Sequence, residues 1–291
     1  MAFLQYLLSG LLTGGIYGLI GLAIVIIYKS TKVFNFAVGT LMTFCALICV
    51  ELVTRVGLPF WIALPTSLGL SGLLGFLAER LGMRPLLAQP VLTLIMATLA
   101  IESILYGVMV IVWEGYTISF PRGLLPGRTI FLGPLFIPHE FLYSFVVAGI
   151  AFIIIGLFFF KTHTGLKMRV TAESHDVAMA LGINITRIFS MSWILATIVG
   201  ALAGIFIGNR LGLQVAITPS LAFKALPAII FGGLDSVAGA IIGGLTVGIV
   251  EKMAAGYIDP SIAEITPYII LLLVLIVRPQ GLFGEERIER I

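Results

Sequence analysis

Long apolar runs, separated by short polar stretches, dominate the pattern of this chain. A helix needs about 20 mostly apolar residues to cross a bilayer. The runs that reach or approach this length are residues 3–28, 40–53, 60–78, 91–113, 141–160, 188–208, 237–250 and 262–277. The pattern predicts an all-α integral membrane protein, a polytopic bundle of about eight to nine transmembrane helices, with one membrane domain over residues 1–291.

Two of the apolar regions are interrupted in a way that predicts broken helices. In residues 29–39, Asn35 lies between Phe34 and Phe36, and Gly39 follows at the start of the next run. Non-helical backbone survives at membrane depth only where protein or water satisfies it. The stretch therefore predicts either a cavity-lining segment or an interfacial turn with aromatic anchors, and the residues alone favour neither.

The second interruption covers residues 221–236. Here a short apolar segment contains Lys224 and Pro227, and a Gly-Gly turn and a glycine-rich run follow it. This combination predicts discontinuous backbone inside the bundle. Elsewhere, glycines at four-residue spacing (10, 14 and 18; 200, 204 and 208) predict helices that approach one another closely.

One carboxylate, Glu102, lies near the middle of the apolar run 91–113. A charged side chain at that depth costs roughly 2.5–3.5 kcal/mol on translocon scales. We expect it to face the bundle interior or water, as a substrate-pathway residue or as a carboxylate paired with a neighbouring helix.

The longest polar stretch between apolar blocks is residues 161–187, and a short helical pattern lies inside it. Thr171 is predicted as its N-cap, Glu173 and Asp176 as residues of or near its first turn, and Gly182 as its C′ residue. Val177, Ala180 and Leu181 would form one narrow apolar face. A short amphipathic helix between two spans is a surface that a soluble partner can contact.

Composition excludes most other classes of protein. The chain is 59% hydrophobic and 11% charged, against about 25% charged residues in a soluble domain. A net charge of +3 gives no reason to expect a nucleic-acid partner. Cys45 and Cys49 have no zinc-site spacing, the three histidines fall in loops without metal-ligand spacing, and no Walker A motif occurs. The first apolar run lacks a basic leader, so it is expected to be a retained span.

Basic residues in short loops set the expected orientation. The cytoplasmic side would hold Lys29 and Lys32, Arg80 and Arg84, residues 161–187 and the C-terminal tail. The opposite side would hold the N-terminus, a long Pro- and Gly-rich loop at 114–140, and residues 209–220 and 257–261. This arrangement requires residues 221–231 to cross as a short or broken segment, which gives about nine crossings.

Three stretches carry a resemblance to a known family. They are residues 14–39 (GGIYGLIGLAIVIIYKSTKVFNFAVG), 165–187 (GLKMRVTAESHDVAMALGINITR), and the end of the chain, FKALPAIIFGGLDSVAGAIIGGLTVGIVE with LIVRPQGLFG. Over its full length the chain resembles the permease subunits of branched-chain amino acid ABC transporters of the leucine/isoleucine/valine type. Val38 stands where relatives often have His before Gly39.

The resemblance implies a permease of the bacterial inner (plasma) membrane that is not an enzyme. Its implied partners are a second permease subunit in a homo- or heterodimer, two cytoplasmic ATPases that bind ATP-Mg, and a periplasmic solute-binding protein. It implies no cofactor, metal or catalytic residue in this chain. Urea, short amides or aromatic acids are alternative substrates, and an ion-coupled secondary transporter is the alternative class.

By the same resemblance, the loop 161–187 holds the coupling helix that fits a groove in the ATPase. The residues expected to couple are Thr171, Glu173, Asp176, Ala180, Gly182 and Asn184. Ala180 and Gly182 would make close contact, and Glu173 and Asp176 would supply cap or rim charges. The residues expected along the translocation path are Asn35, Phe36, Gly39 and Glu102.

Overall fold

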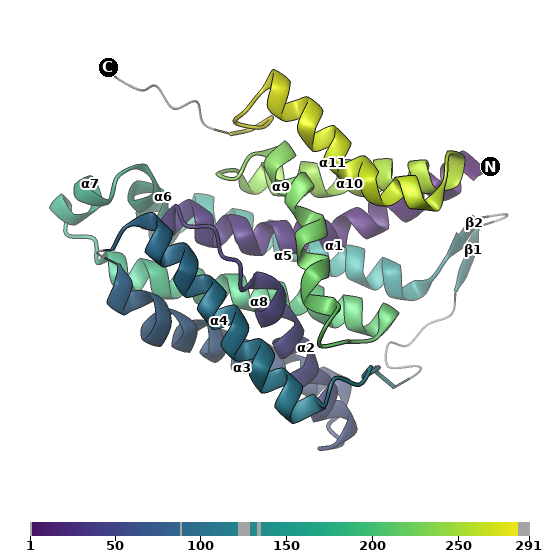
Figure 1. Ribbon diagram of the computed structural model, residues 1–291, viewed down its shortest axis with the longest axis horizontal. Coiled ribbons are helices and arrows are strands. Elements are labelled where there is room, and N and C mark those ends of the chain that lie inside the picture. The colour runs from purple at the N-terminus through teal and green to yellow at the C-terminus, as the bar shows by residue number, and fades with distance from the viewer. Residues whose placement is uncertain (1, 88, 122–128, 133–134, 285–291) are drawn as a thin grey trace.

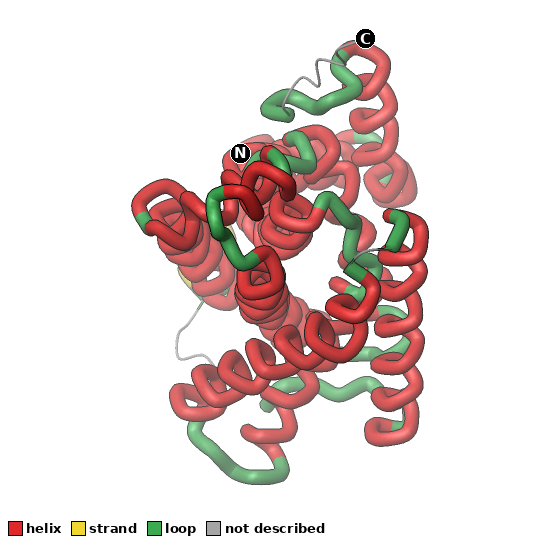
Figure 2. The backbone as a smooth tube through the Cα atoms, turned by 90° about the vertical axis from the view of Figure 1, so that its left-hand side faces the viewer, coloured by secondary structure: helices red, strands yellow, loops and turns green. Residues whose placement is uncertain are grey.

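A computed structural model describes residues 2–87, 89–121, 129–132 and 135–284, and these residues are mostly helical (Figures 1 and 2). The long helices are α1 (Ala2–Thr31), α2 (Val38–Thr54), α3 (Phe60–Leu77), α4 (Val91–Trp113), α5 (His139–Lys161), α8 (Ile185–Leu211), α10 (Val237–Tyr257) and α11 (Pro260–Val277). The short ones are η1 (Ala78–Met83), η2 (Arg84–Leu86), α6 (His163–Glu173), α7 (His175–Ala180), η3 (Thr218–Ala225) and α9 (Leu226–Gly232).

Within the described residues, seven helices are long and apolar enough to span a membrane, and Val38–Thr54 and Thr218–Gly232 are shorter apolar helical segments. The predicted all-α bundle is therefore confirmed. One feature was not predicted: part of the 114–140 loop folds into an antiparallel hairpin of β1 (Ile130–Leu132) and β2 (Leu135–Ile137). Pro126 and Pro134, which belong to the predicted loop, lie outside the described residues.

Contacts between distant segments define two ends of the bundle. At one end Lys32 pairs with Asp235, and we name this the Lys32 end. At the other, the Tyr6 and Tyr257 rings lie 5.6 Å apart, and we name this the Tyr6 end. The N-terminus and the β1–β2 hairpin lie together at the right of Figure 1, with α6 and α7 at the left.

The contacts of the loops show that successive crossings of the bundle run in opposite directions between these two ends. The chain segments that follow α4 and α8 meet through a bridge between Ile118 and Leu213. The α9–α10 turn carries Asp235 back to the Lys32 end. The segment η3–α9 therefore runs from one end to the other as a broken crossing, as the orientation argument required.

Helix α1 is the centre of the bundle. In its most apolar window 89% of the residues are buried, against 11% in α11. Its residues join the main core cluster together with residues of α2, α8, α9 and α10. Because α4, α5 and α11 bury little of their own surface, they are the helices left to face lipid or another subunit.

Glycines allow α1 and α10 to touch backbone to backbone. A Cβ added to Gly14 would lie 2.7 Å from the Gly244 carbonyl oxygen, and one added to Gly248 would lie 2.5 Å from the Gly14 nitrogen. The predicted close packing of the first glycine series is confirmed. In the second series only Gly204 approaches backbone, at Met42 of α2, while Gly208 meets a leucine side chain.

The stretch after α3, expected to be a loop, continues instead as the π-turn η1 and the 3-10 turn η2. The Glu79 side chain is fully buried there and receives hydrogen bonds from Arg84, at 2.8 Å, and from Ser190 of α8, at 2.6 Å. A buried carboxylate needs such partners, and the pairing holds the chain against α8.

At the Tyr6 end of the bundle, Asp259 is the N-cap of α11. A hydrogen bond from the Ser261 backbone N–H lowers the pKa of Asp259.

We expect Gly14→Ala to destabilise the protein, because its added methyl must push two helix backbones apart. Overpacking of this kind costs about 1–3 kcal/mol. Thermal unfolding in detergent should show a midpoint lowered by several degrees. The matched control is Gly149→Ala on α5, whose added Cβ meets nothing within 4 Å. An equal shift in both variants would contradict the assigned contact.

Candidate functional site: the α6–α7 helices and the broken segments

The polar stretch 161–187 forms two helices, α6 and α7, which meet at Ser174. Thr162 caps α6, accepting a hydrogen bond from the Gly165 N–H at 2.9 Å. Ser174 has an extended backbone (φ −155°, ψ 125°), and its hydroxyl accepts from the Val177 N–H at 3.3 Å. Ser174 is therefore the N-cap of α7, and it makes the break between the two helices.

The structure corrects two of the predicted positions. Thr171 is not an N-cap: it is buried inside α6, and its hydroxyl donates to the Lys167 carbonyl at 2.8 Å. Glu173 is the last residue of α6 and does not lie in a first turn. Both errors have one cause: Thr171 and Ser174 are each acceptable caps by composition, and only the extended backbone at Ser174 tells them apart.

Other predicted positions are confirmed as local structure. Asp176 lies in the first turn of α7. Gly182 has φ +73°, and its N–H donates to the Met179 carbonyl, which ends the helix in the left-handed conformation that suits glycine. Asn184 does not belong to α7. It is the N-cap of α8, and its side chain accepts a hydrogen bond from the Arg187 N–H at 3.0 Å.

Helix α7 presents small and apolar side chains outward. Val177, Met179 and Leu181 are 54%, 57% and 67% exposed, whereas Ala178 is buried against the bundle. Ala180 and Gly182 are also exposed. Exposed apolar side chains on a short helix outside the spans form a surface suited to another protein.

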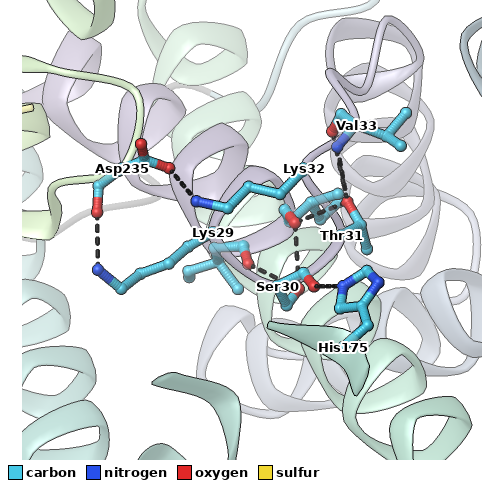
Figure 3. A network of polar contacts seen from close by, with 9 residues as sticks. Lys29, Ser30, Thr31, Lys32, Val33, His175 and Asp235 are labelled. Carbon is cyan, nitrogen blue, oxygen red and sulfur yellow. Dashed lines mark hydrogen bonds and ion pairs between the residues drawn. The ribbon is translucent and has the colours of Figure 1, made fainter. Parts of the chain in front are cut away.

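His175 joins α7 to the end of α1 (Figure 3). Its Nε2 lies 3.4 Å from the Ser30 carbonyl oxygen, and its ring packs on Phe189 of α8 with centroids 5.6 Å apart. Two residues beyond Ser30, Lys32 turns the chain with φ +55°. The exposed helix is thereby in contact with the central helix of the bundle.

Two lysines at the end of α1 and just beyond it bind Asp235 in the turn before α10. Lys32 Nζ lies 2.9 Å from Asp235 Oδ1, and Lys29 Nζ donates to the Asp235 carbonyl at 2.8 Å. Sequence reasoning named both lysines only as orientation signals; it missed Asp235 as their partner and the contact of His175 with Ser30. The separation of these residues along the chain left no sequence signal for the pairing.

The first broken segment enters the bundle without helical structure, as predicted. Asn35 is 1% exposed; its Oδ1 accepts from the Ala37 N–H at 3.0 Å, and its Nδ2 is buried with no partner among the described residues. The Phe36 N–H donates to the Thr98 hydroxyl of α4 at 3.2 Å. Because this backbone is satisfied by side chains from inside the bundle, it need not face lipid.

The two broken segments meet at Gly39, near the start of α2. A Cβ there would collide with the Pro219 carbonyl oxygen of η3, so only glycine permits this approach. Glu102 lies close by and is half-buried: the Thr40 hydroxyl donates to its Oε1 at 3.3 Å. The structure thus brings Asn35, Phe36, Gly39 and Glu102 to one region, and it places α7 at the Lys32 end.

The architecture defines a class: a polytopic helical membrane protein with broken segments in its interior and a short exposed helix at one end. A family model described as the permease component of a branched-chain amino acid transport system matches residues 6–277. The chain belongs to that family. The resemblance drawn from three sequence stretches is confirmed, and the chain is a multi-pass protein of the bacterial inner membrane.

Relatives match it over nearly their whole length. The high-affinity branched-chain amino acid transport system permease protein BraD of Pseudomonas aeruginosa is 27% identical, with 99% of this chain and 98% of BraD covered. The permease protein LivH of the corresponding system in Escherichia coli K12 is 24% identical with the same coverage. A probable LivH of Methanocaldococcus jannaschii is 28% identical over 92% of this chain and 88% of its own.

Among solved structures, a chain of PsaBC from Streptococcus pneumoniae, determined in complex with an Fab, has a similar fold. The TM-score is 0.50 with 14% sequence identity, and the match covers 95% of this chain and 93% of that one. A likeness at this identity concerns the fold alone.

The cap assignment predicts that Ser174→Ala loosens α7. Loss of an N-cap costs about 0.5–2 kcal/mol, so amide hydrogen exchange over residues 175–180 should accelerate several-fold in detergent or nanodiscs. Ser174→Asp retains an acceptor and should keep the native exchange rates. Thr171→Val should leave residues 175–180 unaffected, and an acceleration there equal to that of Ser174→Ala would show that the wrong cap has been assigned.

Proposed function

We propose that this chain is a translocating subunit of an ATP-binding-cassette importer for branched-chain amino acids. A second permease subunit would complete the path, two cytoplasmic ATPases would bind ATP-Mg, and a periplasmic binding protein would deliver the solute. This chain would perform no bond-making chemistry. The names of its relatives and the match of the family model support the substrate class.

One observation carries the mechanism: an exposed helix, α7, rests on the end of the most buried helix. ATP-driven closure of the ATPases would displace α7 and, through His175 and Ser30, the end of α1. The Lys32–Asp235 pair would pass the displacement to α10. A ligand can shift a conformational equilibrium only through differential contacts, and α7 provides a place for them.

We propose an alternating-access mechanism, in which the path opens to one side of the membrane at a time, and the residues expected along the path fit it. The buried, irregular backbone at Asn35 and Phe36 is hydrogen-bonded to α4 through the Phe36 N–H, and Gly39 is in close contact with η3. Movement of α1 against α10 would act on both broken segments, since α1 leads directly into the first and α9 packs against both α1 and α10. Asn35, Phe36, Gly39 and Glu102 are our candidates for the narrow part of the path.

Two alternatives are less well supported. Urea, short amides or aromatic acids remain different solutes for the same machine, and no relative named above carries such a name. An ion-coupled secondary transporter would need intramembrane charges that are free to exchange an ion. Its candidates are Glu102, Lys224 and Asp235. Asp235 is paired with Lys32 and Lys224 with Glu264, while Glu102 accepts a hydrogen bond from the Thr40 hydroxyl. Such a transporter would also have no use for an exposed α7.

The substrate and energy source are tested by uptake. Cells that produce this chain with the transport proteins encoded beside its gene should accumulate labelled leucine, isoleucine or valine. Uptake should collapse with vanadate, which blocks ATPase turnover, and should persist with an ionophore. The opposite pattern would identify a secondary transporter, and uptake of urea or an aromatic acid in place of leucine would correct the substrate.

The coupling assignment predicts that Ala180→Arg abolishes transport. A bulky charge on the exposed face of α7 would block close contact with a partner, so substrate-stimulated ATP hydrolysis should fall more than about tenfold, a loss of ~1.4 kcal/mol of coupling. The chain should still reach the membrane at the wild-type level.

Ala180→Ser is the matched control, because it keeps a small side chain at the same position and should retain stimulation. Co-purification of the ATPases through a tag on this chain provides a second measurement, expected to fail for Ala180→Arg only. Normal stimulation and normal co-purification in Ala180→Arg would remove α7 from the coupling surface.

A further inference from the structure

A cavity of about 360 Å³ lies among α1, α8, η3, α10 and α11; it borders the second broken segment, and none of Asn35, Phe36, Gly39 and Glu102 lines it. It is nearer the Tyr6 end, since Arg210 is the penultimate residue of α8 and Glu251 lies in the last third of α10. Its polar lining includes Thr13, Tyr17, Arg210, Lys224, Glu251 and Lys252. In a chain with 11% charged residues, five charged side chains gather at this cavity: Lys224, Glu251 and Lys252 are partly buried, and Arg210 and Glu264 are exposed.

One acidic group lies at the inner part of the cavity. Glu251 accepts a hydrogen bond from the Tyr17 hydroxyl at 2.6 Å, and Lys252 Nζ approaches it at 3.4 Å. The Glu251 side chain is 16% exposed, so part of the carboxylate still reaches open space. A second carboxylate, Glu264, pairs with Lys224 nearer the surface at 3.1 Å, where the two side chains are 73% and 40% exposed.

Two donors in the same cavity are left without such a partner. The Arg210 guanidinium stacks over the Phe141 ring at 4.1 Å, and no described carboxylate forms an ion pair with it. The Thr13 hydroxyl is buried and has no hydrogen-bond partner among the described residues. A buried polar group without a partner in a cavity points to a ligand or water that the protein alone does not supply.

The charges and walls together match one chemical class. Three cations and two carboxylates line the cavity, which leaves one positive charge in excess and suits a carboxylate. Glu251 and Glu264 can receive an ammonium group. Between the charges the walls are aliphatic, with Ile16, Ile207 and Leu221 among them. The cavity volume lies within the roughly 300–1,000 Å³ of small-ligand sites.

We propose that this cavity is a binding site for a zwitterionic α-amino acid with an aliphatic side chain. The ligand's carboxylate would contact Arg210 and Thr13, its ammonium would contact Glu251, and its side chain would lie against the isoleucines. The proposal rests on the proposed function, which it deepens: it gives the permease a solute site of its own, before the narrow part of the path. A charged group within a span is costly, and an ammonium bound at Glu251, inside α10, would offset that cost.

The test uses the complete transporter with Ala255→Cys, a cavity-lining residue, as a reporter. Both native cysteines are buried and should not react. The measured quantity is the rate of labelling by a water-soluble methanethiosulfonate, without binding protein or nucleotide, so that weak millimolar binding is detectable. L-leucine should slow labelling several-fold. 3-Methylbutylamine and 4-methylpentanoate, each lacking one charge, should not.

Glu251→Gln and Arg210→Gln should each weaken protection by leucine about tenfold, whereas Arg210→Lys should restore part of it. The amide introduced by Glu251→Gln keeps an oxygen acceptor for the Tyr17 hydroxyl, so the local fold should survive. Glu51→Gln is the matched control. Glu51 lies on α2, away from the cavity, and its carboxylate accepts a hydrogen bond from Trp113 Nε1 at 2.9 Å. Its replacement should leave protection by leucine unchanged.

Undiminished protection in both Glu251→Gln and Arg210→Gln would overturn the site, as would equal protection by the amine alone. Absence of protection in a preparation that takes up leucine would also overturn it and leave the proposed function standing. A parallel uptake measurement with binding protein and ATP keeps the two apart: failure to take up any aliphatic amino acid would refute the function, whatever the labelling shows.

Discussion

The whole arrangement depends on the backbone contact between α1 and α10. Lipid gives little hydrophobic drive for helix association, so close packing of backbones has to supply it. Glycines at Gly10, Gly14 and Gly18 on one helix and Gly244 and Gly248 on the other make that contact without side chains between them. With α1 fixed in this way, α8 and α5 pack against it, and 89% of its apolar window is buried.

The same constraint explains where polar groups are found. Helix α1 has no room for charges along its buried length, so its lysines lie at its last turn and beyond, where Asp235 meets them. Towards the other end Tyr17 hydrogen bonds to Glu251 on the neighbouring α10. These charges lie where a helix ends or where a cavity separates the helices, whereas Glu102, in the middle of α4, is held by the Thr40 hydroxyl.

Much of this could be predicted from the sequence, because hydrophobic run length and glycine spacing are local signals. The apolar run locates the span Val91–Trp113 to the residue, and one asparagine between aromatics indicates the irregular entry at Asn35. The side of the bundle that Glu102 faces could not be predicted, since it depends on how α4 is rotated about its axis. The split at Ser174 was missed because Thr171 offered an equally good cap by composition.

Contacts between distant residues were beyond reach for a different reason. His175 meets Ser30, Glu251 meets Tyr17 and Gly39 meets Pro219 only after the helices have packed. Each pair joins two halves of the chain, and periodicity within one segment contains no information about its partner in another. The charged cavity belongs to this group, because its lining comes from five elements that are individually ordinary.

If α7 binds the ATPases and the cavity binds the solute, as proposed, both sites contact a single helix, α1. Tyr17 lies at the cavity and Ser30 lies next to His175, and the thirteen helical steps from Tyr17 to Ser30 correspond to about 20 Å at 1.5 Å per residue. A helix packed on all sides cannot bend freely, so displacement at one end is felt at the other. Linkage then requires reciprocity: if binding of a partner to α7 changes the affinity of the cavity for its solute, the solute must change the affinity of α7 for that partner by the same factor. A permease built in this way could signal occupancy to its ATPases through α1 itself.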